Sequence, residues 1–294
     1  MFEYYVLPPL FHVVSVVWKG IVSCRDFLCA VFIRSSVTLG RKVYIKQTRL
    51  AYEEAANIRF IRRSTPIPVP RVFLAFHIPA WAFWWQRKWS WGEKVPHTSD
   101  AFIFMERIDG RSLDAETWLS LDDAARNLIL SQLRLFISEM RSLCPPPSTA
   151  IGSVGGAVVD DRLAQGWSSR MDFDICGPYQ DEADMNLALR RQQPLSQFGP
   201  SVIASHQHSH PLVFTHGDIA LRNIMIRDRA VVALIDWEAA GWFPAHWEYL
   251  KAHWVPVRHE GERLWRGCVG EVMTPYEQER KADLDLLDQL SKIN

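Results

Sequence analysis

The chain lacks a net charge. Its 294 residues include 33 lysines and arginines and 33 aspartates and glutamates, which cancel at neutral pH. A protein that binds nucleic acid usually carries a basic excess, because contacts to phosphates supply much of the affinity. The balance therefore argues against a nucleic-acid partner. Hydrophobic residues make up 48% of the chain, ample for a large core.

Cysteine is also scarce. The chain has five cysteines, Cys24, Cys29, Cys144, Cys176 and Cys268. They show neither paired spacing nor the short spacing of metal-binding motifs. A disulfide framework is therefore not expected, and the pattern fits a reducing compartment. We expect a cytoplasmic protein.

A hydrophobic run long enough to cross a membrane is missing from the apolar first 33 residues. The longest stretch there without a charged residue runs from Tyr4 to Trp18, short of the roughly 20 residues that a span needs. No basic segment precedes it, so a signal peptide is not expected. Apolar residues recur at helical spacing, which predicts an extension over 1–33 containing an amphipathic helix packed on the protein. Attachment to a membrane surface is the alternative.

Residues able to do chemistry concentrate between positions 212 and 238. Three short apolar segments, 212–214, 224–226 and 231–235, are typical of strands. Polar turn residues separate the last two, which predicts a hairpin. Asn223 begins this hairpin and Asp236 ends it, so both side chains should lie at the same end.

Asp218 stands in the loop just before the hairpin. Carboxylate and amide oxygens are hard ligands that suit Mg²⁺, and the remaining carboxylate is free to accept a proton from an attacking hydroxyl. Phosphoryl transfer needs this arrangement, because positioning and charge neutralisation supply nearly all of its catalysis. Each position alone could be a solvated loop residue, but the joint pattern of Asp218, Asn223 and Asp236 favours a phosphoryl-transfer site.

A nucleotide-binding segment should then lie upstream. Residues 42–46 alternate as a half-buried strand that ends at Lys46, and residues 49–62 have helical spacing with Glu54 in the first half. A lysine so placed can reach the α- and β-phosphates of ATP if a carboxylate holds it. The alternative is that Lys46 and Glu54 are solvated. The downstream pattern favours the nucleotide role.

The stretch from Phe214 to Trp254 closely resembles the aminoglycoside phosphotransferase and choline kinase family, and more narrowly its large fungal branch. The motifs that carry the resemblance are Thr215-His216-Gly217-Asp218, Asn223, Ile235-Asp236-Trp237-Glu238, Gly241-Trp242-Phe243-Pro244 and Trp247-Glu248-Tyr249. The resemblance implies an α+β, bilobal protein-kinase-like fold with a small N-terminal antiparallel-sheet lobe and a larger, mainly helical C-terminal lobe. It also implies transfer of the γ-phosphoryl group of ATP, or alternatively GTP, to a hydroxyl of a small molecule.

The resemblance also assigns roles by position. Asp218 matches the catalytic base, and Asn223 and Asp236 match the Mg²⁺ ligands. His216 matches the loop histidine that supports the site, with a purely orienting role as the alternative. Glu54 matches the helix glutamate that holds the lysine of the nucleotide lobe.

The boundary between the lobes is expected near Gly110. The segment Met105–Gly110 resembles the connection whose backbone meets the adenine ring, so Glu106 and Ile108 are expected nucleotide contacts. The predicted units are the extension at 1–33, a nucleotide-binding lobe at 34–109 with a Trp-rich insertion at 79–98, and a catalytic and substrate-binding lobe at 110–294.

The sequence also contains features that weaken the assignment. The predicted phosphate loop at 34–41 has one glycine and two serines where protein kinases have a glycine-rich loop. Together with the Trp-rich insertion at 79–98 and the apolar start, this keeps a catalytically inactive, kinase-like binding protein as the alternative function.

The larger lobe offers further candidates outside the motifs. A capping signal at 120–123 predicts a helix that runs to Met140 and is stopped by prolines, and a terminal helix at 276–293 is expected to close the substrate cleft. Glu238 and Glu248 are candidate substrate contacts or structural residues, and the nearby tryptophans should pack the core.

Two polar stretches of this lobe have plainer interpretations. The acidic stretch Asp172, Asp174, Asp181, Glu182 and Asp184 could face a cationic substrate, but a solvated helix face is favoured. The alternating His206, His208 and His210 would bind zinc only if further ligands converged on them, and the sequence shows none.

Overall fold

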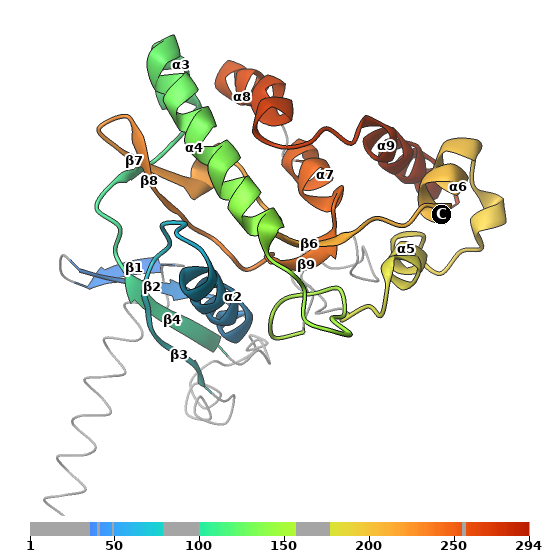
Figure 1. The fold of residues 1–294 in the computed structure, drawn as a ribbon, viewed down its shortest axis with the longest axis horizontal. Coiled ribbons are helices and arrows are strands. Elements are labelled where there is room, and N and C mark those ends of the chain that lie inside the picture. Colours follow the sequence, from blue (N-terminus) through green and yellow to red (C-terminus); the bar gives the residue numbers. More distant parts are fainter. Residues whose placement is uncertain are drawn as a thin grey trace, which may run out of the picture.

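The computed structural model describes residues 36–39, 42–48, 50–78, 100–156, 177–254 and 257–293, which form a small sheet-containing lobe and a larger helical lobe (Figure 1). The predicted N-terminal extension, the Trp-rich insertion and part of the predicted phosphate loop lie outside the described residues. So do Asp172 and Asp174 of the acidic stretch.

In the residues that the structure describes, the small lobe is a four-stranded antiparallel sheet with helix α2 packed on it. Its strands are β1 (Ser36–Leu39), β2 (Val43–Gln47), β3 (Val72–Ile78) and β4 (Asp100–Glu106), in the order β1-β2-β4-β3. Helix α2 (Ala51–Ser64) follows β2 and packs beside the sheet (Figure 1). The strand expected at 42–46 and the helix expected at 49–62 are confirmed.

Alternation along the strands explains how the sheet packs. Phe102 and Ile45 are buried on one face of the sheet. Ala101 and Ile103, the neighbours of Phe102 in β4, are buried on the opposite face together with Ala51 of α2. This is the period of two that places successive side chains on opposite faces of a strand.

The largest apolar core extends from the larger lobe onto helix α2. Ile58 and Ile61, in the second half of α2, are buried in the same cluster as Phe214, Trp237 and other residues of the larger lobe. One face of α2 therefore packs on both lobes, and the helix couples the sheet to the segment that contains Trp237.

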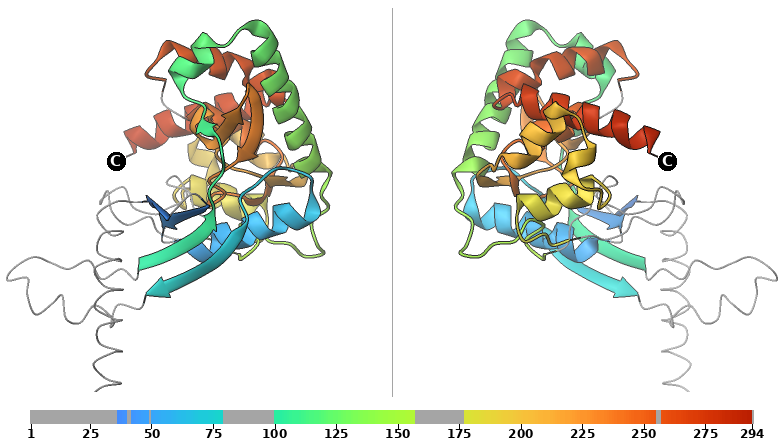
Figure 2. Two further views of the ribbon diagram at one scale, coloured as in Figure 1. Left: turned by 90° about the vertical axis from the view of Figure 1, so that its left-hand side faces the viewer. Right: turned by 90° about the vertical axis from the view of Figure 1, so that its right-hand side faces the viewer.

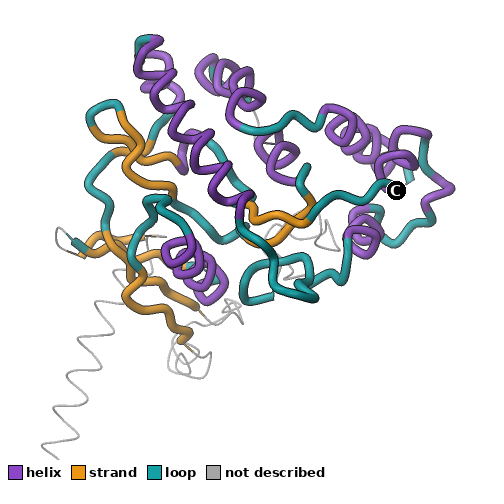
Figure 3. Tube along the Cα trace, viewed as in Figure 1, coloured by secondary structure: helices purple, strands orange, loops and turns teal. Residues whose placement is uncertain are grey.

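The larger lobe contains two small sheets surrounded by helices (Figures 2 and 3). Strands β5 (Arg111–Ser112), β7 (Ile224–Arg227) and β8 (Ala230–Leu234) form one sheet, and β6 (Leu212–Thr215) pairs with β9 (Gly241–Pro244) in the other. The antiparallel pairing of β7 and β8 confirms the predicted hairpin.

The helices of this lobe are α3 (Ala115–Ser120), α4 (Asp123–Ser142), α5 (Glu182–Leu189), α6 (Pro200–Gln207), α7 (Trp247–Trp254), α8 (Glu260–Val272) and α9 (Glu277–Lys292), with short 3₁₀ turns η3 (Leu195–Gln197) and η4 (Leu221–Asn223). None of the helices in the described part of the chain combines the length and the hydropathy that crossing a membrane requires.

Helix α4 begins where the capping signal predicted. The Asp122 carboxylate accepts a 2.8 Å hydrogen bond from the backbone N–H of Ala125, which satisfies one of the unpaired donors of the first turn. The terminal helix α9 is also confirmed, and its Leu286 and Leu290 are buried. It contributes no lining residue to either cavity described below, which gives no support to the expectation that it closes the substrate site.

Candidate active site

Lys46 lies at the centre of a cluster of three carboxylates. Strand β2 carries its Nζ to 2.8 Å from Glu54 Oε2, on the first half of α2. The same Nζ lies 2.5 Å from Asp236 Oδ1 and 3.0 Å from Glu238 Oε2, in the segment after β8. The sheet, helix α2 and the segment after β8 thus meet at one ammonium group.

The cluster holds more negative charge than one ammonium neutralises. Burial alone would lower the pKa of Lys46, but the carboxylates, with Glu54 the strongest, raise it above its usual value. Burial raises the pKa of Glu54 to about 7, against the opposing effect of Lys46 and with a further rise from Asp236 and Glu238. Lys46 therefore stays protonated at neutral pH, and the three carboxylates share one ammonium group as their ion-pair partner.

Asp236 reaches this cluster through an unusual backbone conformation. Its φ is 68°, in the left-handed region that residues other than glycine seldom adopt, although aspartate tolerates it better than most. The segment that follows is held by Asn57 of α2, whose side-chain amide donates to the carbonyls of Trp237 at 2.9 Å and Ala240 at 2.8 Å. The conformation is thus fixed by hydrogen bonds from the other lobe.

Buried Glu248, at the start of α7, holds the loop that carries Asp218. Its Oε2 accepts from the backbone N–H of His216 at 2.6 Å, and its Oε1 accepts from that of Gly217 at 3.1 Å. Gly217 has φ 78°, and a Cβ there would lie 2.4 Å from the carbonyl oxygen of Ala239, so only glycine fits this turn. Glu248 is therefore a structural residue, which resolves the alternative that the sequence left open.

The ring of His216 joins the two loops of the site. Its Nδ1 lies 3.2 Å from the backbone N of Asp218, and its Nε2 lies 3.1 Å from the carbonyl oxygen of Ile235. Because an N–H can only donate, Nδ1 must be the acceptor and Nε2 the donor. His216 is fully buried, so this tautomer fixes Asp218 relative to the segment that leads to Asp236.

Asp218 and Asn223 are in direct contact. The Asn223 amide nitrogen donates to Asp218 Oδ2 at 2.7 Å and to the Asp218 carbonyl at 2.8 Å. An Nη of Arg222 lies 2.7 Å from both Asp218 carboxylate oxygens. The carboxylate is thus oriented by an amide on one side and by a guanidinium on the other.

A cavity of about 360 Å³ opens beside Lys46, between the two lobes. It contains six of the eight predicted site residues, namely Lys46, Glu54, Glu106, Ile108, Asn223 and Asp236. Asp218 and His216 are not among its lining residues. The Glu106 carboxylate accepts from the backbone N–H of Arg71 at 3.1 Å, so this side chain is already engaged at the rim.

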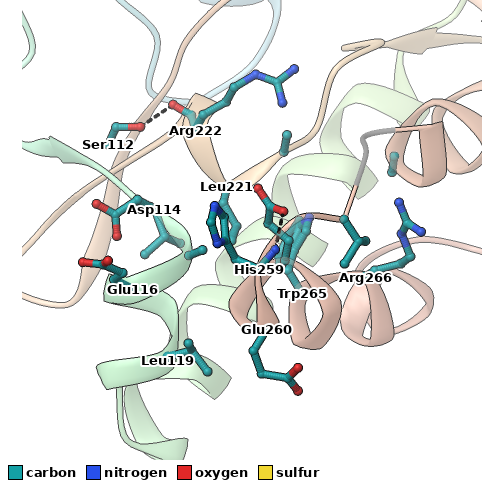
Figure 4. A pocket seen from close by; sticks show the side chains of 16 residues that line it. Ser112, Asp114, Glu116, Leu119, Leu221, Arg222, His259, Glu260, Trp265 and Arg266 are labelled. Atoms are coloured by element: carbon teal, nitrogen blue, oxygen red, sulfur yellow. Dashed lines mark hydrogen bonds between the residues drawn. The ribbon is translucent and has the colours of Figure 1, made fainter.

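A second cavity of about 580 Å³ lies between α3 and the start of α8, next to the turn at Leu221 and Arg222 (Figure 4). Asp114 and Glu116 of α3 lie on one side of it, and His259 and Trp265 lie on the other (Figure 4). Ser112 lines both cavities, and its hydroxyl donates to the carbonyl of Arg222. The two cavities therefore meet at β5.

Two residues that organise the site were missed by the sequence analysis. Asn57 lies three residues after Glu54 and next to Ile58, which places it on the buried face of α2. That spacing was a usable signal, because a polar residue on an apolar face needs a partner. Arg222 gave no such signal, since its contact with Asp218 depends on the 3₁₀ turn η4.

Comparison with known proteins shows which proteins this chain is similar to. The model of the phosphotransferase enzyme family matches residues 37–273. No curated protein matches the chain significantly. Several solved structures do match it, and three of them are described in the next paragraph.

The ADP-bound aminoglycoside phosphotransferase APH(2'')-Ib is 13% identical, with a TM-score of 0.49 over 88% of this chain and 90% of that one. A putative aminoglycoside phosphotransferase from Ralstonia eutropha is 16% identical, with a TM-score of 0.48 over 86% and 76%. Aminoglycoside phosphotransferase APH(4)-Ia is 12% identical, with a TM-score of 0.47 over 92% and 98%.

The family model covers well over half of the chain, including the cluster at Lys46 and the loop at Asp218. The α+β, protein-kinase-like fold expected from the sequence, with its small antiparallel-sheet lobe and larger helical lobe, is confirmed. The chain therefore belongs to the phosphotransferase enzyme family.

Proposed function

We propose that this protein is a kinase that transfers the γ-phosphoryl group of ATP to a hydroxyl of a small molecule in the cytoplasm. The observation that carries the proposal is the position of Lys46, held among three carboxylates at the edge of a cavity that Asn223 and Asp236 also line. These residue types match what phosphoryl transfer needs, since its catalysis consists mainly of positioning and charge neutralisation.

The nucleotide would occupy the 360 Å³ cavity. Lys46 is directed to the α- and β-phosphates and is kept in place by Glu54, which is 1% exposed. Glu106 and Ile108 lie in the wall formed by the connection between the lobes, where the base would contact the backbone. Nothing in this wall selects adenine over guanine by a side-chain contact, so GTP remains a second donor to test.

The residues also fit a divalent cation. Three carboxylates surround a single ammonium, so the cluster has an uncompensated negative charge, and its donors are the hard oxygens that Mg²⁺ prefers. We assign Asn223 and Asp236 as the ligands, and bound Mg²⁺ would neutralise the phosphate oxygens. Glu238, at 3.0 Å from Lys46, would keep the lysine paired when Asp236 binds the metal.

Asp218 would act as the general base. The acceptor hydroxyl gives its proton to the Asp218 carboxylate while its oxygen bonds to the γ-phosphorus. The bond from that phosphorus to the bridging oxygen breaks, and the nucleoside diphosphate leaves with the electron pair. Arg222 and Asn223 keep the carboxylate in place without protonating it.

The acceptor would bind in the 580 Å³ cavity (Figure 4). This cavity is bounded by the 3₁₀ turn that directly follows the Asp218 loop, and it shares Ser112 with the nucleotide cavity. A hydroxyl placed at this shared edge would lie between the base and the phosphates.

The test compares the wild type with Asp218→Asn. Binding of Mg·ATP is measured calorimetrically, and ADP release is measured alone and with a panel of hydroxyl-bearing metabolites. We expect Asp218→Asn to bind Mg·ATP normally and to lose about 10²- to 10⁴-fold in transfer rate, the usual contribution of a general base. Asp228→Asn, in the exposed turn of the β7–β8 hairpin, is the matched control and should keep full activity.

The alternative is a kinase-like binding protein without activity. It would bind Mg·ATP but release ADP no faster than Asp218→Asn does, with every acceptor in the panel. Failure of the wild type to bind Mg·ATP or Mg·GTP would overturn the nucleotide assignment as well.

A further inference from the structure

A cluster of histidine and glutamate side chains lies away from the nucleotide cavity, where four segments of the larger lobe meet. Glu182 is the first residue of α5, His210 precedes β6, His246 lies between β9 and α7, and Glu279 is in the first turn of α9. All four side chains are mostly buried, and the most exposed of them, Glu279, is 14% accessible.

Three of these residues present their ligand atoms to a common point. Glu182 Oε1 lies 2.8 Å from His210 Nδ1 and 3.6 Å from His246 Nδ1, and one ligand atom from each residue lies within 4.8 Å of the other two. Two ligands of a tetrahedral zinc ion, each about 2.0–2.1 Å from the metal, are roughly 3.4 Å apart. The observed separations bracket that value.

His246 provides an independent sign that the cluster binds something. Its Nδ1 is buried and has no hydrogen-bond partner among the described residues. Burying a polar atom without a partner destabilises a protein, so such atoms are rare unless a ligand satisfies them. The nearest carboxylate oxygen, at 3.6 Å, is too far for a hydrogen bond but well placed for a shared metal.

The outer contacts of the cluster are those of a metal site. His210 Nε2 lies 3.3 Å from Glu279 Oε1, so the ring nitrogen that faces away from the cluster is paired with a carboxylate. A metal-bound histidine typically donates its second N–H in this way, which fixes its tautomer and orientation. The second oxygen of Glu182 accepts from the backbone N–H of His210 at 2.7 Å, so the carboxylate is oriented too.

We propose that Glu182, His210 and His246 form a zinc-binding site, with Glu279 as the carboxylate that orients His210. Three protein ligands of this kind leave a fourth position for water, as in many sites with imidazole and carboxylate ligands. A bound ion would stabilise the fold of this lobe, because it would connect α5, the end of the two-stranded β6–β9 sheet and, through Glu279, α9.

The proposed site changes two interpretations drawn from the sequence, one of Glu182 and one of the alternating histidines. Glu182 is not on a solvated helix face, since it is 8% exposed and faces two histidines. Further ligands do converge on the alternating histidines, but only on His210. His206 instead contacts Arg190, and His208 is exposed.

The proposed zinc site lies close to the residue that holds the loop carrying Asp218. His246 lies two residues before Glu248, whose carboxylate holds the backbone of His216 and Gly217. Zinc at His246 would therefore fix the start of α7, from which the loop is held. The proposal does not depend on the kinase assignment, because none of its ligands lines the nucleotide cavity.

The experiment measures Zn²⁺ binding to the full-length protein after treatment with EDTA and dialysis. The titration uses a zinc-binding dye in the presence of excess Mg²⁺, which occupies the oxygen-ligand site at Asn223 and Asp236. Zn²⁺ binding at the histidines is still measured, because imidazole ligands prefer zinc to magnesium. We expect one tight site and a thermal transition that rises with Zn²⁺ concentration. His246→Ala and His210→Ala should abolish tight binding, and Glu279→Gln should weaken it about 10- to 100-fold.

His208→Ala is the matched control and should bind Zn²⁺ like the wild type, because His208 is exposed and its ring packs against that of His210 without offering a ligand atom to the cluster. If the His246 or His210 variants fail to fold, Co²⁺ substitution in the wild type decides, since a four-coordinate Co²⁺ site absorbs strongly in the visible. Absence of stoichiometric Zn²⁺ in folded wild type, or equal affinity in the His246 and His208 variants, would overturn the proposal. The cluster would then be a hydrogen-bonded packing contact.

Discussion

Asn57 and Trp237, 180 residues apart in sequence, are joined by a 2.9 Å hydrogen bond from the side-chain amide of the first to the backbone carbonyl of the second. The same amide also donates to Ala240, and its oxygen accepts from the backbone N–H of Val154 at 3.0 Å. Asn57 is fully buried and thus connects α2, the segment after Asp236 and the segment around Val154.

Replacing Asn57 with alanine should therefore disturb both stability and nucleotide binding. The buried carbonyl of Ala240 and the N–H of Val154 lose the Asn57 side chain, and the carbonyl of Trp237 keeps only the N–H of Ala240, so we expect the free energy of unfolding in urea to fall by about 2 kcal/mol. Mg·ATP affinity should fall as well, because the segment that positions Asp236 is no longer held. Asn127→Ala, on the exposed face of α4, makes the same substitution in a helix and should leave both quantities unchanged. Equal stability of the two variants would contradict the role of Asn57.

The charges around Lys46 lead to a prediction that a double-mutant cycle can test. Lys46→Met leaves buried Glu54 without its cation, so we expect the free energy of unfolding to fall by about 3 kcal/mol. This is the lower end of the range for a broken buried ion pair, because Asp236 and Glu238 are about one-third exposed. Adding Glu54→Gln should restore part of that loss, since the buried charge is then gone. Urea denaturation of the four proteins measures the coupling, and strictly additive effects would show that the pair is not coupled.

Much of the site was predictable because its residues stand in local patterns. Lys46 ends an alternating strand, Glu54 lies on a helix with a clear apolar face, and the β7–β8 hairpin brings Asn223 and Asp236 to one end. In each case the period of the element fixes the direction of the side chain within a few residues.

Contacts between distant segments were not predictable in this way. Glu182 looks like a solvated helix residue because its own neighbours are polar, and its partner His210 lies 28 residues later. Glu248 likewise gave no sign that it would accept from the backbone of His216, 32 residues earlier. Such pairings depend on how α5 and α7 pack, which no local period encodes.

The cap of α4 should give a pH-dependent contribution to stability. The N–H of Ala125, followed by Arg229, lowers the pKa of Asp122 below its ordinary value. A lowered pKa in the folded state means that the stabilisation is present above the unfolded pKa, about 3.9, and is lost as the pH falls below it. Asp122→Ala should therefore lower the melting temperature at pH 7 but have less effect near pH 3. Asp122→Asn keeps an uncharged cap, so it should lower the melting temperature less than Asp122→Ala does at both pH values. The change in that effect between pH 7 and pH 3 should be the same for the two variants, because neither replacement titrates.

Asp123→Ala is the control for this prediction. Asp123 is the exposed neighbour of Asp122, pairs only weakly with Arg126 and does not cap the helix. Its replacement should shift the melting temperature much less than Asp122→Ala does at pH 7. If the Asp122→Ala shift were the same at pH 7 and pH 3, the ionised carboxylate would not be the stabilising group.

The last prediction concerns the support of the catalytic loop by Glu248. Glutamine has one carbonyl oxygen where glutamate has two carboxylate oxygens, so Glu248→Gln leaves the N–H of either His216 or Gly217 facing an NH₂ group. A buried donor without an acceptor costs about 1–3 kcal/mol, and the turn at Gly217 should open locally. Faster hydrogen exchange of the amides at 216–218 measures this opening without knowledge of the acceptor substrate. Glu271→Gln, at an exposed position of α8, should leave these amides protected, and equal protection in the two variants would mean that Glu248 does not hold the loop.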